Sequence, residues 1–130
     1  MKDTMIKNFL ILSCIGKEDK IGLRINEKFH IHNFDKKTDI DLLALNILNM
    51  IKKYKTNIDN NFSIIVNNGP GSFSSLRAAI AVAKGIKISK KINLYGFQNR
   101  DLGQFKLANI ELLIKKNLIR KNLIKPIYLS

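Results

Sequence analysis

The residues whose types and spacing come nearest to chemistry lie in the stretch VNNGPGSFSSLRAAIAVAKGI, residues 66–86. Gly69, Pro70, Gly71 and Ser72 follow an apolar run and precede a long run of small residues. Backbone N–H groups in such a loop, together with a helix N-terminus, can hold a phosphate group. The same residues can also form a tight corner between a strand and a helix. The sequence therefore offers two interpretations, a phosphate cradle or a corner.

Three features favour the corner. The loop lacks the Gly-Lys-Ser/Thr of a nucleotide-binding P-loop and the third glycine of a dinucleotide fingerprint. Pro70 removes one N–H donor that a cradle would use, and Gly69 and Gly71 permit the backbone angles that a tight corner requires. The cradle stays as an alternative, with Gly69, Gly71, Ser72 and Arg77 as its candidate anion contacts.

The helix expected after this loop is apolar on two faces. One face carries large and small apolar residues at helical spacing: Leu76, Ala79, Ile80, Ala83 and Ile86. The second face carries small residues: Ala78, Ala81, Val82 and Gly85. A helix of this kind is buried on two sides. The second face is expected either to contact a helix of another chain or to be internal to this one.

Other residues that could support catalysis lack partners in the sequence. His30 and His32 share one face of a predicted strand, but no cysteine or acidic cluster completes a metal site, which favours a solvated strand face. Cys14 has no visible partner base and is expected in the core. The serines near Gly71 do not form a Gly-x-Ser-x-Gly nucleophile elbow. We predict no catalytic residue, no metal site and no cofactor.

The charge balance is strongly basic. The 130 residues include 23 Lys and Arg against 10 Asp and Glu, a formal net charge of +13. A basic surface attracts nucleic acid, but abundant Lys, Ile and Asn also follow from A- and T-rich codons, and no aromatic residues are interleaved with the lysines. The single cysteine and the absence of a signal-peptide pattern or a long apolar run predict a cytoplasmic protein without a membrane span.

Periodicity predicts an α/β fold. The expected strands are residues 8–15, 20–26, 28–34, 62–66 and 91–97, and the expected helices are residues 39–55, 72–89 and 107–123, the last closed by Pro126. The order β-β-β-α-β-α-β, followed by a helix, predicts a five-stranded mixed sheet with helices packed on it.

One stretch resembles a known family. Ten positions match the Gly-Pro-Gly-Ser-Phe-Thr-Gly-Leu-Arg…Ala-Lys-Gly signature of the TsaB (YeaZ) family, whose relatives are the TsaD/Gcp glycoprotease-like proteins: Gly69, Pro70, Gly71, Ser72, Phe73, Leu76, Arg77, Ala83, Lys84 and Gly85. The final KPIYLS is similar to the Pro-x-Tyr-Leu-Arg at the end of many members.

The resemblance implies an actin-like, RNase H-like ATPase-superfamily fold and a role in making threonylcarbamoyladenosine at position 37 of tRNAs. It implies a non-catalytic subunit that forms a heterodimer with TsaD, the metal-bearing transferase, with TsaE joining as an ATPase and tRNA reached only through the complex. The expected contact is a helical bundle on the two helices at residues 39–55 and 72–89. We predict these interface residues: Leu43, Ile47, Met50, Leu76, Ala78, Ala81, Val82 and Gly85.

The chain also departs from the family pattern. Its first strand continues as LILSCIGKED, without the family's Asp-Thr-Ser turn, and only residues 98–130 stand where the family has a second subdomain. We therefore predict a first subdomain at residues 1–97 and a reduced remnant at residues 98–130. The alternatives are a nucleotide- or RNA-binding module that uses the Gly69–Ser72 loop and the basic surface, or a degenerate relative that forms homodimers.

Overall fold

The chain forms a five-stranded mixed sheet with helices on both faces. A computed structural model describes residues 6–34, 39–121 and 124–128. The strands, in the sheet order β3-β2-β1-β4-β5, are β1 Phe9–Ser13, β2 Lys20–Ile25, β3 Lys28–Asn33, β4 Ser63–Asn67 and β5 Asn93–Phe97. The first three strands pair antiparallel, whereas β4 pairs parallel with β1 and β5 parallel with β4. The predicted mixed sheet is confirmed.

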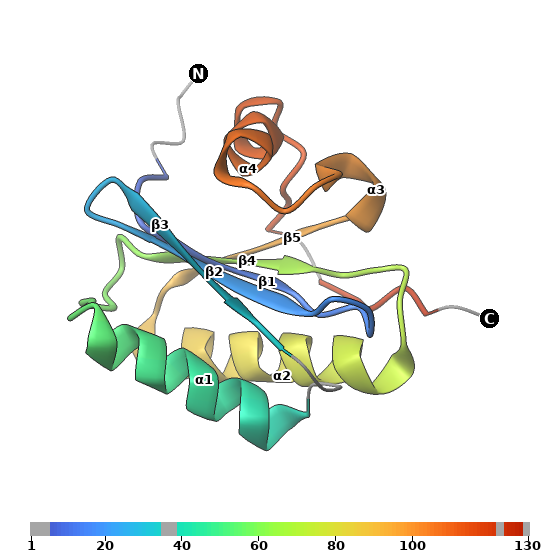
Figure 1. Cartoon of the computed structure of the whole chain (residues 1–130), viewed down its shortest axis with the longest axis horizontal. Helices are drawn as coiled ribbons and strands as arrows, with labels where there is room; N and C mark the ends of the chain where they lie inside the picture. The colour runs from blue at the N-terminus through green and yellow to red at the C-terminus, as the bar shows by residue number, and fades with distance from the viewer. Residues whose placement is uncertain (1–5, 35–38, 122–123, 129–130) are drawn as a thin grey trace.

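The helices form two layers. Helices α1 (Ile40–Lys53) and α2 (Phe73–Lys90) cover one face of the sheet, and α3 (Asn99–Leu102) and α4 (Leu107–Lys115) lie on the other (Figure 1). Because side chains alternate along a strand, β1 contributes to two cores. Leu10 and Leu12 pack on the side of α1 and α2, and Phe9 and Ile11 pack on the side of α4.

Helix α1 has a clear start and a clear buried stripe. The Asp39 carboxylate accepts a hydrogen bond from the Leu42 N–H at 2.8 Å, which caps the helix N-terminus. Leu43, Ile47 and Met50, at helical spacing, are buried against the core. Helices α1 and α2 both run back from the end of one strand to the start of a parallel strand, so they lie parallel and end on the same side of the molecule (Figure 1). Within the described residues, no helix combines the length and the apolar character that crossing a membrane requires.

The C-terminal region differs from the prediction. Helix α4 ends at Lys115, eight residues before the expected end, so Pro126 does not close it. Asn117 has a φ of 60°, which takes the chain out of the helix, and Arg120 then exchanges two backbone hydrogen bonds with Gly96 on the edge of β5. Pairing with the sheet edge therefore overrides the apolar helical pattern. The short helix α3 also lies in a segment expected to be a loop.

Candidate partner interface on helices α1 and α2

The Gly-Pro-Gly loop has its N–H donors occupied within the chain. The Gly69 N–H donates to Asn67 Oδ1 at 2.9 Å, the Gly71 N–H to the Ile127 carbonyl at 3.1 Å, and the Ser72 N–H to the Ile15 carbonyl at 2.9 Å. Pro70 has no N–H to offer. A phosphate cradle needs these donors directed at a ligand, so the loop acts as the corner that the sequence favoured.

At both glycines of the loop, neighbouring backbone atoms leave no room for a Cβ atom. Gly69 has a φ of 109°, and a Cβ there would run into the Ile127 carbonyl oxygen. A Cβ on Gly71 would lie 2.8 Å from the Ile15 carbonyl oxygen. The corner therefore brings three segments together: the end of β1, the start of α2 and residues 124–128. Ser72 occupies the N-cap position of α2, but its side chain makes no capping hydrogen bond.

Most of the predicted interface residues belong to the core. The following five are buried within the chain: Leu43, Ile47, Met50, Leu76 and Ala78. The physical reason is that the three α1 residues pack with sheet residues in the core, while α1 and α2 pack side by side. Leu43, Ile47, Met50 and Leu76 cannot touch a partner unless the fold opens, so their assignment to the contact surface is corrected, whereas Ala78 borders a hollow described below. Ala81 and Gly85 are exposed and Val82 is half-buried, so these three remain within a partner's reach.

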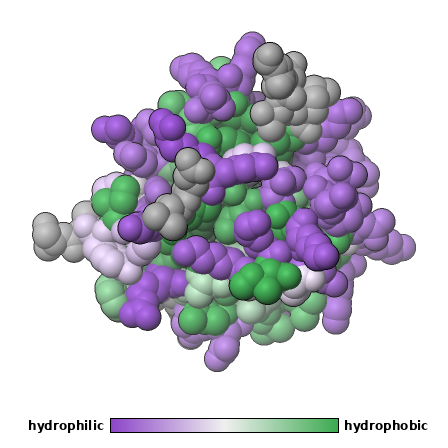
Figure 2. Space-filling view, turned by 180° about the vertical axis from the view of Figure 1, so that it is seen from behind, coloured by the Kyte–Doolittle hydropathy of each residue, from purple (hydrophilic) through white to green (hydrophobic). Residues whose placement is uncertain are grey.

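The exposed side of the two helices carries small and apolar residues together with Arg77. We call it the helical face, and its members are Leu45, Leu48, Arg77, Ala81, Gly85 and Ile88. Ile88 is 82% exposed, Leu45 54% and Leu48 48%. No atom lies within 4 Å of a Cβ built on Gly85, so the surface is open there. Figure 2 shows hydrophobic residues along the lower border of the molecule, where the helices lie, separated by hydrophilic ones.

A hollow lies at the start of both helices. It has a volume of about 490 Å³ and is lined by Asp39, Ile40, Asp41, Phe73, Ser74, Arg77 and Ala78. The Arg77 guanidinium lies 4.8 Å from the centre of the Phe73 ring, and the Tyr128 ring lies 4.9 Å from the same ring. Phe73 is 56% exposed despite these contacts. The hollow can therefore accept an apolar side chain next to charged groups.

A buried amide joins the strand ends on the other side of the corner. Asn67 is fully buried, and its Nδ2 donates to Ser13 Oγ at 3.2 Å and to Asn99 Oδ1 at 3.0 Å. This network ties β1, β4 and α3 together beside an open cleft of about 590 Å³. Sequence reasoning missed Asn67, although a polar residue directly after the apolar run of residues 62–66 was a usable signal.

The two histidines and the cysteine considered in the sequence analysis pack against other side chains of the chain. The His30 ring stacks on the Tyr54 ring with their centres 3.7 Å apart, and His32 meets Phe34 edge-on. In the described part of the chain, no three His, Cys, Asp or Glu side chains gather in a way that could hold a metal ion. Cys14 is buried in the core, as predicted.

Comparison with solved structures identifies the fold. The chain matches "YeaZ from Pseudomonas aeruginosa" with a TM-score of 0.64 and 17% sequence identity, over 74% of this chain and 45% of that one. It also matches a protein described as uncharacterized, with similarity to the peptidase YeaZ from Pseudomonas aeruginosa, with a TM-score of 0.61 and 18% identity, over 74% of this chain and 44% of that one. No protein-family model matches the chain, and no curated protein matches it.

These matches confirm the resemblance at the level of the fold. The YeaZ structures have the actin-like, RNase H-like ATPase type of fold, as predicted for this chain. The chain spans less than half the length of the two solved structures. The division at residue 97 stays a prediction. In the structure, Ile110 and Leu113 of the C-terminal region pack on the sheet and cover its second face.

Proposed function

We propose that this chain is a non-catalytic, TsaB-like subunit that binds a TsaD-type partner through the helical face, in the cytoplasmic pathway that forms threonylcarbamoyladenosine in tRNA. The observation that carries the proposal is the exposed set of small and apolar residues on α1 and α2, in a chain whose fold matches that of YeaZ over 74% of its length. The signature residues at the Gly69–Ser72 corner set where α2 begins.

The shape of the helical face suits helix-on-helix docking. Ala81 and Gly85 lie one turn apart on α2, so the backbone of a partner helix can approach closely between the larger side chains at either end. The distance between packed helices is set by the side chains at the contact, and small ones give the shortest distances. Complete burial of a fully exposed aliphatic side chain contributes roughly 1.5–3 kcal/mol. Ile88, at 82% exposed, can gain most of that amount in such a contact, and Leu48, at 48%, about half.

The test is complex formation with matched variants. Ala81→Glu places a charge on the helical face, and Gly85→Leu fills the open space found there. We expect both variants to keep the fold and to lose co-elution with the cognate TsaD in size-exclusion chromatography with light scattering. The control is Ala108→Glu, the same change at an exposed position of α4 on the far side of the sheet, which is expected to leave binding unchanged.

The outcomes separate the competing functions. If Ala81→Glu still forms a one-to-one complex with TsaD, the helical face is not the contact. If the unmodified chain forms only a homodimer that Ala81→Glu dissociates, the same face serves self-association and the proposed subunit role is wrong. A chain that binds neither TsaD nor itself also contradicts the proposal.

A further inference from the structure

Six lysines gather at the end of the molecule where helices α1 and α2 finish. We call this surface the basic end, and its members are Lys52, Lys53, Lys55, Lys87, Lys90 and Lys91. All six are exposed. Because α1 and α2 are parallel and packed side by side, their last turns lie at the same end of the molecule (Figure 1). The basic end thus joins two segments that are more than 30 residues apart in sequence.

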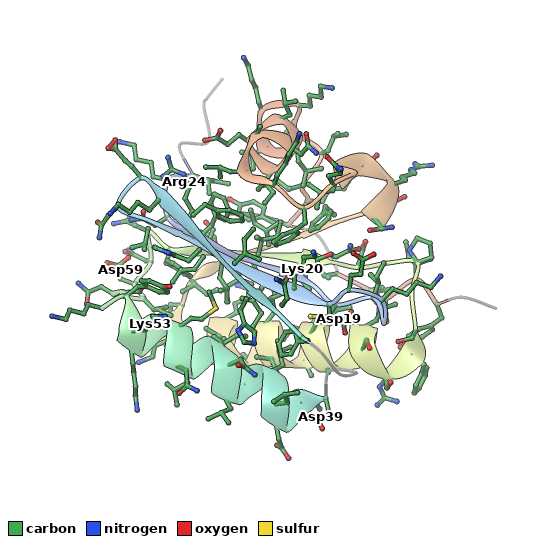
Figure 3. All side chains as sticks on the ribbon, viewed as in Figure 1. Asp19, Lys20, Arg24, Asp39, Lys53 and Asp59 are labelled. Carbon is green, nitrogen blue, oxygen red and sulfur yellow. The ribbon has the colours of Figure 1, made fainter. Side chains whose placement is uncertain are left out.

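The six lysines of this surface form no ion pair in the described part of the chain. In the described ranges, the ion pairs are Arg24 with Glu111 and Arg100 with Asp101, and neither involves the basic end. Asp59 lies at the same end of the molecule as Lys53 (Figure 3) and lines a hollow together with Lys55. Its carboxylate accepts the Asn61 N–H at 2.9 Å and offsets one of the six positive charges. Helix C-termini favour one or two cations through their dipole, and six exceed that structural need.

A polar hollow adjoins the basic end. It has a volume of about 310 Å³ and is lined by Asn8, Ile25, Asn26, Lys55, Asn57, Asp59, Asn61 and Phe62. Four of these residues are asparagines, whose amides offer both donors and acceptors. Lys55 belongs to the hollow and to the basic end, so the two features are continuous. The volume lies near the lower limit of small-molecule pockets, about 300 Å³.

We propose that the basic end binds single-stranded or loop RNA, with the phosphates on the six lysines and one base in the asparagine-lined hollow. Unpaired RNA exposes the edges of its bases for hydrogen bonding, and amide side chains match those edges. Lysine ammonium groups neutralise phosphates with little dependence on sequence. The hollow favours RNA over an anionic membrane, because a membrane offers no base for the amides. This inference uses a different surface from the helical face and does not depend on the proposed subunit role.

The experiment compares two variants of equal charge. Lys52, Lys53, Lys87 and Lys90 lie on helices and are exposed, so replacing all four with alanine keeps the fold. The control replaces Lys106, Lys115, Lys116 and Lys125 with alanine, four exposed lysines outside the basic end. Binding of a fluorescent RNA oligonucleotide of about 16 nucleotides is measured by anisotropy over a series of salt concentrations, with TsaD absent.

The expected results are quantitative. Each phosphate contact on a single strand contributes about 0.7 to the slope of log affinity against log salt. Losing four contacts lowers that slope by about 3 and weakens binding about 100-fold or more near 0.1 M salt, while the control variant changes little. Asn57→Ala, in the hollow, is expected to weaken binding without changing the slope.

Three results would overturn the inference. The first is an equal loss in the two lysine variants, which would mean that net charge alone governs binding. The second is no RNA binding by the unmodified chain at low salt. The third is binding to phosphatidylserine vesicles that is as tight as binding to RNA. Loss of TsaD binding in the Ala81→Glu variant leaves each of these outcomes readable, because the RNA measurement contains no TsaD.

Discussion

Ser75 carries a buried hydroxyl group in the first turn of α2. Among the described residues, its Oγ has no hydrogen-bond partner. A buried polar group without a partner costs about 1–3 kcal/mol. Alanine has nearly the same volume as serine, lacks the hydroxyl and favours the helix by roughly 0.5 kcal/mol. We therefore expect Ser75→Ala to stabilise the chain by about 1–2 kcal/mol.

The neighbouring Ser74 provides a matched control. It lies in the same turn of α2 but is exposed, so Ser74→Ala gains the helix preference without relieving a buried hydroxyl. The difference between the two variants isolates the cost of burial, which we expect to be about 1 kcal/mol or more. Urea denaturation gives the free energies of unfolding, and thermal melts give a parallel measure, since 1 kcal/mol shifts the melting temperature of a chain of this size by about 3–5 °C.

One result would refute this reasoning. If Ser75→Ala is less stable than the unmodified chain, the hydroxyl must form a favourable interaction, for example by donating to a backbone carbonyl of the preceding turn. In that case the corner and the helix start are held together by the serine. If Ser75→Ala and Ser74→Ala shift stability equally, burial of the hydroxyl has no measurable cost.

A substitution at Gly71 and a titration of Tyr95 test the packing of the corner and of the sheet. Gly71→Ala would place a methyl group against the Ile15 backbone, which cannot rotate away as a side chain could. We expect the free energy of unfolding, measured by urea denaturation, to fall by about 2–4 kcal/mol, or the chain to fail to fold. An unchanged denaturation midpoint would show that the corner has room for the methyl group. Burial raises the pKa of the Tyr95 phenol above 10.0, its ordinary value. The neutral phenol is thus favoured in the folded state, so its contribution to stability is complete below pH 10 and is lost as the pH rises through the folded-state value. Ultraviolet difference titration of the folded chain should show a tyrosine that ionises above pH 10.0 and is lost in Tyr95→Phe, and an unchanged titration curve in that variant would contradict this.

Strong local signals made most of the sheet layer predictable. Residues 9–13 and 63–67 are short apolar runs, and residues 20–25 alternate with period two, so strands were recognisable without tertiary information. The α1 stripe at Leu43, Ile47 and Met50 was equally clear as an apolar pattern. These residues were predicted to contact a partner but are buried in this chain, because periodicity shows which residues are buried and not which element covers them.

The C-terminal region was less predictable because long-range contacts decide its structure. Its apolar pattern continues past Lys115, yet Arg120 pairs with Gly96 and Ile124 fills the space above the same glycine. Neither contact has a signature within residues 116–124. The exposure of Ala81 and Gly85 likewise depends on how α1 packs beside α2, which the sequence of α2 alone does not determine.

The two faces of the sheet have separate roles, and the topology explains why. Parallel pairs such as β1–β4 and β4–β5 need both faces covered. Helix α4 supplies the second cover together with Leu118 and Ile119. Ile127 holds the corner through backbone hydrogen bonds with Asn68 and Gly71. Of the nine exposed large hydrophobic side chains among the described residues, five lie on α1 and α2: Ile40, Leu45, Leu48, Phe73 and Ile88. Variants on the helical face and on the basic end should therefore alter binding without unfolding the chain, whereas variants at the corner should destabilise the fold itself.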